Sequence, residues 1–424
     1  MRKKQLNYAL IAGHVVECFD ATIYGFYAVI LAPYFFPPSF SQVTQSFLAF
    51  AAGFVVRPLG AIFFGFLGDR FGRKKPLLAS MALVGVPTLV IGVLPTYSEI
   101  GMWATVTLIM CRLAQGFFYG AEFSGVTVYT YENNTKSNTL GKKMGILVAS
   151  GSMGAVLATG MGAFLTMQGM PAQAWRIPFI FGGVAAFLIF LFRRYMQETE
   201  HFQEAKKKKQ ISSMPTLALW RYRGEMLTAL LISSLNYVPL YLVTVFGNQM
   251  FKTFGYTSSE SLLLNMSTLI FDSIMIVIYG RLADRTGFKR QIIWGCTWMS
   301  VIAIPSFYLV SHYQSIYAIY AFMLMISTGN TLVVACTMPY ISTFFPTNCR
   351  YSAVAFSTTL GTAILGGTTP AIANQLTGLI GSPIAPAFYL IFLCLSALIG
   401  IYWISNRNNS SHENNKSLDF ELVN

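Results

Sequence analysis

Long apolar segments separated by short polar ones run along almost the whole chain. Each apolar segment has at least roughly the 20 residues that a helix needs to cross the hydrocarbon core of a bilayer. The segments lie near residues 8–34, 43–67, 76–95, 100–131, 140–167, 176–194, 225–250, 258–283, 290–311, 315–340, 351–378 and 383–405. This pattern predicts an all-α integral membrane protein with twelve transmembrane helices.

One connection is much longer than the others and divides the apolar segments into two groups of six. It follows the sixth segment and holds four consecutive lysines, 206–209. After the last segment the chain becomes polar and rich in Asn and Ser, a composition that buries too little apolar surface to fold. We therefore predict four regions: an N-terminal six-helix bundle (1–195), a cytoplasmic linker (196–224), a C-terminal six-helix bundle (225–405) and a disordered cytoplasmic tail (406–424).

Composition supports the membrane assignment. Of the 424 residues, 54% are hydrophobic and only 11% are charged, whereas a soluble domain carries roughly 25% charged residues. The net charge of +13 does not indicate nucleic-acid binding, because the basic residues gather on alternate connections. All Lys and Arg except Arg57, Arg112, Arg176 and Lys252 fall in segments on one side of a twelve-span threading. The positive-inside rule then places both termini in the cytoplasm. We predict a multi-pass protein of the inner (plasma) membrane, with the lipid bilayer as its surroundings.

The sequence shows no pattern typical of a disulfide framework, a metal site, a nucleotide-binding site or a catalytic site. The six cysteines are scattered, so we expect no disulfide, and the four histidines have no metal-binding spacing. The sequence has no nucleotide-binding P-loop motif and no defensible nucleophile–base grouping. We predict no cofactor, no metal and no enzymatic activity, with a small molecule and protons as partners and a protein that functions as a monomer.

A loop motif occurs once in each half of the chain. At an offset of 215 residues (280 − 65), two glycines, an acid and two basic residues coincide between 65–74 and 280–289. Glycines permit close helix approach and sharp turns, and the acid can cap a facing helix N-terminus. We predict gating loops made by Gly65, Asp69, Arg70, Gly72 and Arg73, and by Gly280, Asp284, Arg285 and Gly287.

The first of these loops resembles the signature loop of the major facilitator superfamily. A second set of motifs resembles the metabolite:proton symporter family, which includes proline/betaine, 2-oxoglutarate, citrate and shikimate carriers. These motifs are Glu17-Cys18-Phe19-Asp20, Arg57-Pro58-Leu59-Gly60, Arg112-Leu113-Ala114-Gln115-Gly116, Trp175-Arg176-Ile177-Pro178, Glu198-Thr199 and Arg350-Tyr351-Ser352. The resemblance implies two pseudo-symmetric six-helix bundles around a central cavity, with alternating access by rocking. The chain departs from the family pattern at Cys18, Ala121 and Thr358-Thr359, positions that bear on the substrate.

Ionisable residues inside the predicted spans are costly and need a reason. In the first span Glu17, Asp20 and Tyr24 share one helix face, and Arg57 lies in the second span. In the fourth span Arg112, Gln115 and Glu122 broadly share a face. We predict a proton-coupling site formed by Glu17, Asp20 and Glu122 with Arg112 as a switching partner, a role that the resemblance also implies for Arg112. The alternative is a permanent ion-pair network joining these spans.

The second half is less polar at membrane depth. Asp272 is the one ionisable residue that lies deep within a predicted span there, and it fits a substrate or proton site as well as a structural charge pair. The substrate-binding candidates are Tyr24, Arg57, Gln115, Asn236, Tyr237 and Asp272.

The sequence thus predicts a secondary active transporter that imports a small carboxylate-bearing solute by proton symport. The solute would be an organic acid or a zwitterion such as proline or betaine, because arginines at depth suit a carboxylate. A proton-linked exporter of drugs or of a siderophore on the same fold is the alternative. A membrane enzyme or a sensor is disfavoured by the duplicated loop.

Overall fold

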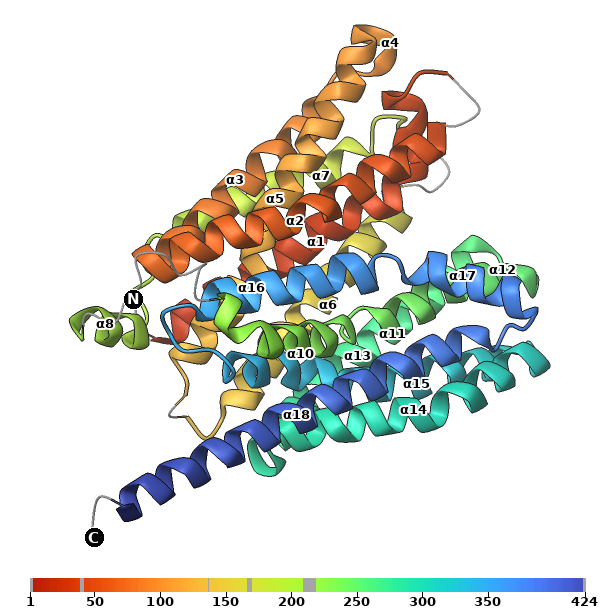
Figure 1. Cartoon of the computed structure of the whole chain (residues 1–424). Helices are drawn as coiled ribbons and strands as arrows, with labels where there is room; N and C mark the ends of the chain where they lie inside the picture. Colours follow the sequence, from red (N-terminus) through yellow and green to blue (C-terminus); the bar gives the residue numbers. More distant parts are fainter. Residues whose placement is uncertain (1–2, 39–41, 136, 166–169, 209–218, 422–424) are drawn as a thin grey trace.

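The computed structural model describes residues 3–38, 42–135, 137–165, 170–208 and 219–421. Within these ranges every regular element is a helix. The first six long helices form one bundle and the remaining ones form a second bundle beside it (Figure 1). The predicted all-α architecture of two six-helix bundles is confirmed.

The N-terminal bundle contains six long helices and one short one. They are α1 (Lys3–Phe35), α2 (Gln42–Phe71), α3 (Lys74–Val93), α4 (Tyr97–Ile100), α5 (Met102–Glu132), α6 (Leu140–Leu165) and α7 (Arg176–Arg193). The long helices lie within a few residues of the first six predicted spans. Helix α8 (Glu200–Lys207) follows in the linker, where the sequence indicated no element; Thr199 caps it by accepting a hydrogen bond from the Phe202 amide.

The C-terminal bundle is more interrupted. Its seventh span is built from η1 (Leu219–Tyr222), α10 (Arg223–Ser234), α11 (Val238–Tyr241), the π-turn η2 (Leu242–Phe246) and α12 (Gly247–Thr253). Helices α13 (Ser258–Thr286), α14 (Phe288–Tyr313) and α15 (Ile316–Ser342) follow. The eleventh span comprises α16 (Arg350–Gly361), the π-turn η3 (Thr362–Gly366) and α17 (Thr369–Ile380), and α18 (Ala385–Glu421) ends the chain. Such single π-helical turns within α-helices (here called π-turns) are frequent at functional sites.

Helix α13 begins with a reciprocal cap outside its apolar stretch. The Thr257 amide and hydroxyl donate to Glu260 at 2.7 and 2.8 Å. The hydrogen bond from the Thr257 amide, followed by that from its hydroxyl, holds the pKa of the Glu260 carboxyl below its ordinary value.

Nine helical stretches of the described chain are long and apolar enough to cross a membrane. The three other predicted spans, α1, α5 and α16–α17, are also helical. They carry many of the buried polar residues, among them Asp20, Arg112 and Thr358. The polarity of these three helices therefore marks where the interior of the protein is not purely apolar.

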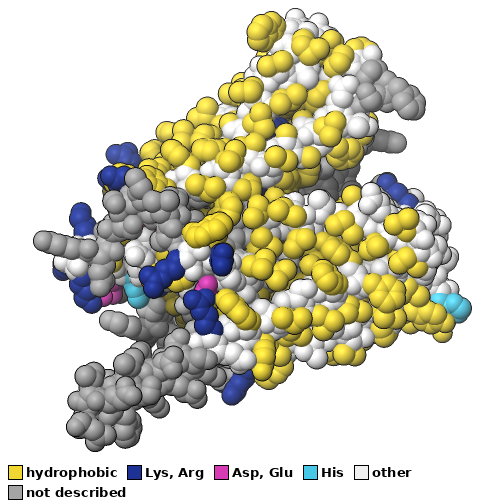
Figure 2. Space-filling view, in the orientation of Figure 1, with side chains coloured by type: hydrophobic (Ala, Val, Ile, Leu, Met, Phe, Trp, Pro, Cys, Tyr) yellow, Lys and Arg dark blue, Asp and Glu magenta, His cyan; other side chains and the backbone are white. Residues whose placement is uncertain are grey.

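The outer surface is that of a membrane protein. Large apolar side chains are exposed along most helices, for example Val55 at 73% and Phe392 at 65%. Figure 2 shows this apolar surface over both bundles, with Lys and Arg gathered at the end where α1 begins and α18 ends. We call this the basic end. Both termini lie there (Figure 1).

Helix α18 extends beyond the last predicted span, which ends at residue 405, to Glu421. The assignment of 406–424 as a separate cytoplasmic tail stays a prediction.

Close helix contacts within a bundle depend on small residues. A Cβ at Gly295 in α14 would lie 2.7 Å from the carbonyl oxygen of Gly329 in α15. We expect Gly295→Ala to destabilise the fold by about 1–3 kcal/mol, because overpacking forces the two helices apart. Thermal unfolding in detergent measures the change. The control is Gly378→Ala in α17, where a Cβ meets nothing within 4 Å; equal melting of the two variants would contradict the prediction.

Candidate functional site: buried charges around two cavities

The duplicated loops hold the two bundles together at the basic end. Asp69 accepts hydrogen bonds from the amides of Tyr351 (3.1 Å) and Ser352 (2.8 Å), at the N-terminus of α16. Asp284 accepts from the amides of Gly141 (2.5 Å) and Lys142 (3.0 Å), at the N-terminus of α6. Each acid thus caps a helix of the opposite bundle, the contact that the sequence indicated.

The glycines of these loops have two physical roles. Gly72 and Gly287 have φ of +105° and +88°, which only glycine adopts at little cost. A Cβ on Gly280 would lie 2.5 Å from the carbonyl oxygen of Gly141, and one on Gly65 would lie 2.7 Å from Ser352 Cα. The bundles approach to backbone contact at these two points.

The loop arginines differ in role. Arg73 is fully buried and lies 3.3 Å from Asp69, whereas Arg70 and Arg285 are exposed. The repeat position of Arg73 in the second half is Phe288 (73 + 215). The ion pair therefore belongs to the first loop and has no equivalent in the second.

A carboxylate that our sequence analysis did not single out, Glu132, joins this ion pair to the other bundle. It accepts two hydrogen bonds from Arg73, at 2.9 and 3.1 Å, and one from Arg350 at 3.1 Å. The Thr199 hydroxyl donates to it at 2.7 Å, and Arg73 also donates to the Thr347 carbonyl at 2.6 Å. We call Arg73, Glu132 and Arg350 the basic-end clasp.

Inside the N-terminal bundle, Asp20 is surrounded by neutral donors. Its Oδ2 accepts hydrogen bonds from Thr88 (3.0 Å), Gln115 (3.2 Å) and the Tyr119 hydroxyl. Its Oδ1 is buried and has no partner within the described residues. The predicted proximity of Asp20 and the fourth-span residues is therefore found, with Tyr119 as an additional member.

Arg112 lies next to this acid without a direct ion pair to it. Its Nη1 donates to Gln115 Oε1 at 2.8 Å, and Gln115 in turn donates to Asp20. The guanidinium lies 4.3 Å from the ring centroid of Tyr24 and 5.4 Å from that of Phe50, a cation–π arrangement. Two of our substrate candidates, Tyr24 and Gln115, thus surround Arg112 inside the bundle.

Glu122 has a partner that the sequence placed elsewhere. It forms an ion pair with Arg193 and accepts a 2.6 Å hydrogen bond from Ser80. By the charge bias alone Arg193 is one of the basic residues predicted on the cytoplasmic side, but it is fully buried at the end of α7. Its long side chain reaches back toward the interior, a direction that linear charge counting cannot show.

Glu17 is engaged by a histidine one turn earlier. His14 Nδ1 lies 3.0 Å from Glu17 Oε2, and the imidazole stacks on Phe123 with ring centroids 5.1 Å apart. Both residues are nearly inaccessible to solvent.

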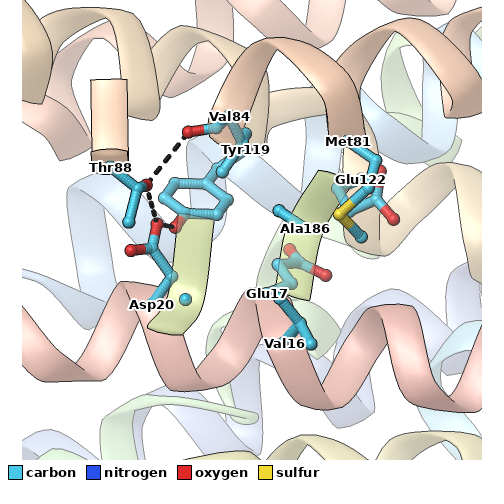
Figure 3. Close-up of a pocket in the computed structure, with 10 residues that line it drawn as sticks. Val16, Glu17, Asp20, Met81, Val84, Thr88, Tyr119, Glu122 and Ala186 are labelled. Carbon is cyan, nitrogen blue, oxygen red and sulfur yellow. Dashed lines mark hydrogen bonds between the residues drawn. The ribbon is translucent and has the colours of Figure 1, made fainter. Parts of the chain in front are cut away.

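The three acids face one small cavity. Glu17, Asp20, Glu122 and Tyr119 line a space of about 10 Å³, close to the size that holds one water. Figure 3 shows Asp20 with Tyr119 and Thr88 on one side of this space and Glu17 with Glu122 on the other. We call it the acid cavity.

A second cavity, of about 50 Å³, lies between the bundles. Glu17 and Tyr119 line it as well as the acid cavity. Its remaining lining residues come from both bundles: Arg57, Phe123, Ser124, Ser233, Asn236, Tyr237, Met338, Thr358, Thr359 and Thr362. We call it the central cavity.

The predicted substrate-binding residues do not all line the same cavity. Arg57, Asn236 and Tyr237 line the central cavity. Asp272 is buried in α13, its Oδ1 has no hydrogen-bond partner among the described residues, and it lines neither cavity. The hydroxyl residues of α10, α16 and η3 were not predicted, although Thr358-Thr359 had stood out as a departure from the family pattern.

Comparison with known proteins agrees with this architecture. The family model of the Major Facilitator Superfamily matches residues 10–367 and 229–422. The shikimate transporter of Escherichia coli is 31% identical over 93% of this chain and 92% of its own length, and the citrate-proton symporter of Klebsiella pneumoniae is 28% identical over 94% and 90%. A putative proline/betaine transporter of Staphylococcus aureus is 29% identical over 92% and 86%.

The fold is also that of solved transporters. The proton:xylose symporter XylE has a TM-score of 0.74 at 14% identity, covering 95% of each chain. The human organic anion transporter MFSD10 has a TM-score of 0.67 at 15% identity, covering 95% of this chain and all of that one. The family model and the relatives, together with this fold, define a multi-pass membrane transporter, not an enzyme. The chain belongs to the major facilitator superfamily.

The Glu122–Arg193 pair yields a stability prediction. Replacing Arg193 by Met leaves a buried carboxylate without its cation, which costs about 3–5 kcal/mol when a buried pair is broken. We expect Arg193→Met to lower the melting temperature in detergent strongly. The double variant Arg193→Met/Glu122→Gln should recover much of the loss, because no charge is then left unpaired. A double variant that melts below the single one would contradict the pairing.

Proposed function

We propose that this protein is a secondary active transporter that imports a small carboxylate-bearing solute together with protons. The observation that carries the proposal is that Glu17 and Tyr119 line both the acid cavity and the central cavity. A change in the protonation of these acids would therefore alter the charge at the wall of the cavity that a solute would occupy.

The chemistry of the acid cavity suits reversible protonation. Asp20 is held by three neutral donors and is bridged to Arg112 by Gln115. A proton on Asp20 removes the charge that Arg112 and the donors stabilise, and so weakens the links from α1 to α3 and α5. A proton that crosses the full membrane potential supplies about 2.3 kcal/mol per 100 mV, enough to bias two conformations of similar free energy.

The relatives support the class of solute. Those named above carry citrate, shikimate and, putatively, proline or betaine, which all bear a carboxylate. Arg57 at the wall of the central cavity is the guanidinium that would receive it. This solute, protons and the lipid bilayer are the partners of the proposal, and we infer that a single chain carries the function.

We further infer the orientation. Positive-inside topology assigns the basic end, with both termini, to the cytoplasm of the inner membrane. The basic-end clasp and the two helix caps join the bundles there, and the bundles diverge toward the opposite end (Figure 1). This arrangement corresponds to an outward-facing state, ready to receive solute from outside.

Transport in proteoliposomes tests the proposal. A pH gradient of one unit should drive roughly tenfold accumulation per coupled proton, and a protonophore should abolish it. We expect Asp20→Asn to lose accumulation yet retain solute exchange across the membrane, because the site remains but the proton no longer binds. Glu225→Gln is the control, since Glu225 pairs with Arg407 at the surface. Full accumulation by both Asp20→Asn and Glu122→Gln, or gradient-driven efflux only, would refute the proposal.

The clasp provides a second test with a native probe. Cys349 is buried and directly precedes Arg350 of the clasp at the start of α16. In Glu132→Gln the two clasp arginines lose their shared counter-charge, so the basic end should open more often. We expect a soluble maleimide to label Cys349 several-fold faster, as quantified by peptide mass spectrometry.

Cys394 serves as the internal reference because it is buried within α18, which packs on α14, α10 and α17 of its own bundle. Faster labelling of both cysteines would indicate general loosening. Unchanged labelling of Cys349 would show that the clasp does not govern the closed end.

A further inference from the structure

Three titratable residues follow one another along α1 toward the basic end, where this helix begins (Figure 1). They are Asp20, Glu17 and His14, each three residues from the next. Residues at this spacing are neighbours on a helix, separated by about 4.5 Å of rise. Such a row can pass a proton along the helix if a hydrogen bond closes each gap.

The gap between Glu17 and His14 is already closed. His14 Nδ1 lies 3.0 Å from Glu17 Oε2, a hydrogen-bonding distance. Both residues are buried, with 4% of His14 and 7% of Glu17 exposed. Transfer of a proton from the Glu17 carboxyl to the imidazole converts a neutral pair into an adjacent ion pair, so it leaves no isolated charge inside the bundle.

The gap between Asp20 and Glu17 contains the acid cavity. Asp20 lies on one side of this cavity and Glu17 on the other (Figure 3). Its volume of about 10 Å³ is close to what one water needs. Asp20 Oδ1 is buried without a hydrogen-bond partner among the described residues, and buried polar atoms of this kind commonly bond an ordered water. One water is enough to bridge the two carboxyl groups.

Glu122, the third acid of the cavity, is held differently. It pairs with Arg193 and accepts a 2.6 Å hydrogen bond from Ser80. Its protonation would leave the Arg193 cation buried and unpaired, which is costly. Within the described ion pairs, neither Asp20 nor Glu17 is bound to an arginine. These two acids are therefore the ones free to exchange a proton.

We propose that Asp20, one water in the acid cavity, Glu17 and His14 form the path by which the coupled proton leaves toward the basic end. The Asp20 carboxyl gives its proton to the water, which gives another to the Glu17 carboxylate. Glu17 Oε2 passes this proton to His14 Nδ1. The imidazolium then loses its Nε2 proton to water at the basic end, and proton exchange with water restores the starting tautomer. The proposal rests on the proposed function and assigns its proton-release group, His14.

The last step is closed in this structure. A Cβ on Gly151 of α6 would lie 2.7 Å from His14 Nε2, so the ring lies against the backbone of that helix. The imidazole also stacks on Phe123 of α5. Leu10, one turn nearer the basic end, is only 3% exposed. The path is thus blocked at the end where the clasp joins the bundles, as alternating access requires.

The charged and titratable neighbours of His14 come from two helices, because the contacts from α5 and α6 are neutral. On α1 they are Glu17 and Cys18, whose Sγ lies 3.8 Å from both ring nitrogens. On α7 it is Arg193, whose guanidinium packs against the α1 backbone at Gly13. Arg193 is already paired across the acid cavity. Glu17 is therefore the group that exchanges a proton with His14.

A comparison of net uptake with exchange tests this path in proteoliposomes, with labelled citrate and labelled proline as probes. Exchange of labelled for unlabelled solute needs no proton release, whereas gradient-driven net uptake releases protons in every cycle. His14→Gln keeps an amide donor for Glu17 but binds no proton. We expect it to retain exchange and to lose net uptake at least about tenfold, because a positioned proton-transfer group contributes roughly 10²–10⁴-fold.

A pH jump on the protein without solute gives a second readout. Proteoliposomes on a solid-supported membrane give a transient current on acidification, and its integral is the charge moved into the protein. In His14→Gln the proton stops at Glu17, about 4.5 Å short in a core of roughly 30 Å. The displaced charge should fall by about 0.15 elementary charge per protein. His312→Gln is the matched control, because His312 is exposed at the far end of α14.

The water step is tested at Ala186, which lines the acid cavity from α7. Ala186→Val fills the cavity and changes no titratable group, so net uptake should fall while exchange persists. Ala185→Val is the control, because this neighbouring residue lines neither cavity. Full net uptake by Ala186→Val would remove the water from the path.

The outcomes separate the proton path from the proposed function. Wild-type protein that displaces charge, loses part of it in His14→Gln and accumulates neither probe would support the path and count against symport. Accumulation by the wild type, with His14→Gln equal to it in both assays, would refute the path and leave symport standing. Equal loss of exchange and net uptake in His14→Gln would show a structural role for His14, and wild-type protein without displaced charge would also overturn the proposal.

Discussion

A charge inside the hydrocarbon region is costly unless another group compensates for it, and this constraint shapes the interior of the protein. Glu122 pairs with Arg193, Glu17 with His14, and Arg112 reaches Asp20 through Gln115. Each link joins two helices of the N-terminal bundle or two turns of one helix. The polar core therefore links α1, α3, α5 and α7 to one another.

The same constraint acts where the bundles meet. Asp69 and Asp284 each satisfy the free amides at the start of a helix in the opposite bundle. A carboxylate and a helix N-terminus compensate each other, so each contact is favourable only while the bundles are together. The clasp adds one carboxylate shared by two arginines on opposite sides. These contacts are few and local, as a rocking mechanism requires.

The two bundles divide the chemistry between them. The N-terminal bundle holds the acid cavity, and the C-terminal bundle contributes a wall of hydroxyl groups to the central cavity. The π-turns η2 and η3 interrupt the seventh and eleventh spans, and η3 begins with Thr362 of the wall. Glu17 and Tyr119 form the boundary between the two cavities. A solute and a proton in these two cavities, as we propose, would influence each other without direct contact.

The sequence by itself determined the helical membrane fold, its twelve segments and the duplication. Segment length and apolar content fix whether a helix crosses a bilayer, and matched loops such as Asp69 and Asp284 reveal the repeat. It also indicated Asp20, Glu122 and Arg57, because ionisable residues stand out against an apolar background.

Only the tertiary structure decided which partner each charge has. Arg193 and Glu132 lie at span ends, where sequence cannot distinguish a topology charge from one that turns inward along its flexible side chain. The hydroxyl residues of the central cavity were hidden for a related reason: serine and threonine are common in membrane helices, and their role depends on which helix face meets the other bundle. That choice is made by packing between distant segments, which no local pattern records.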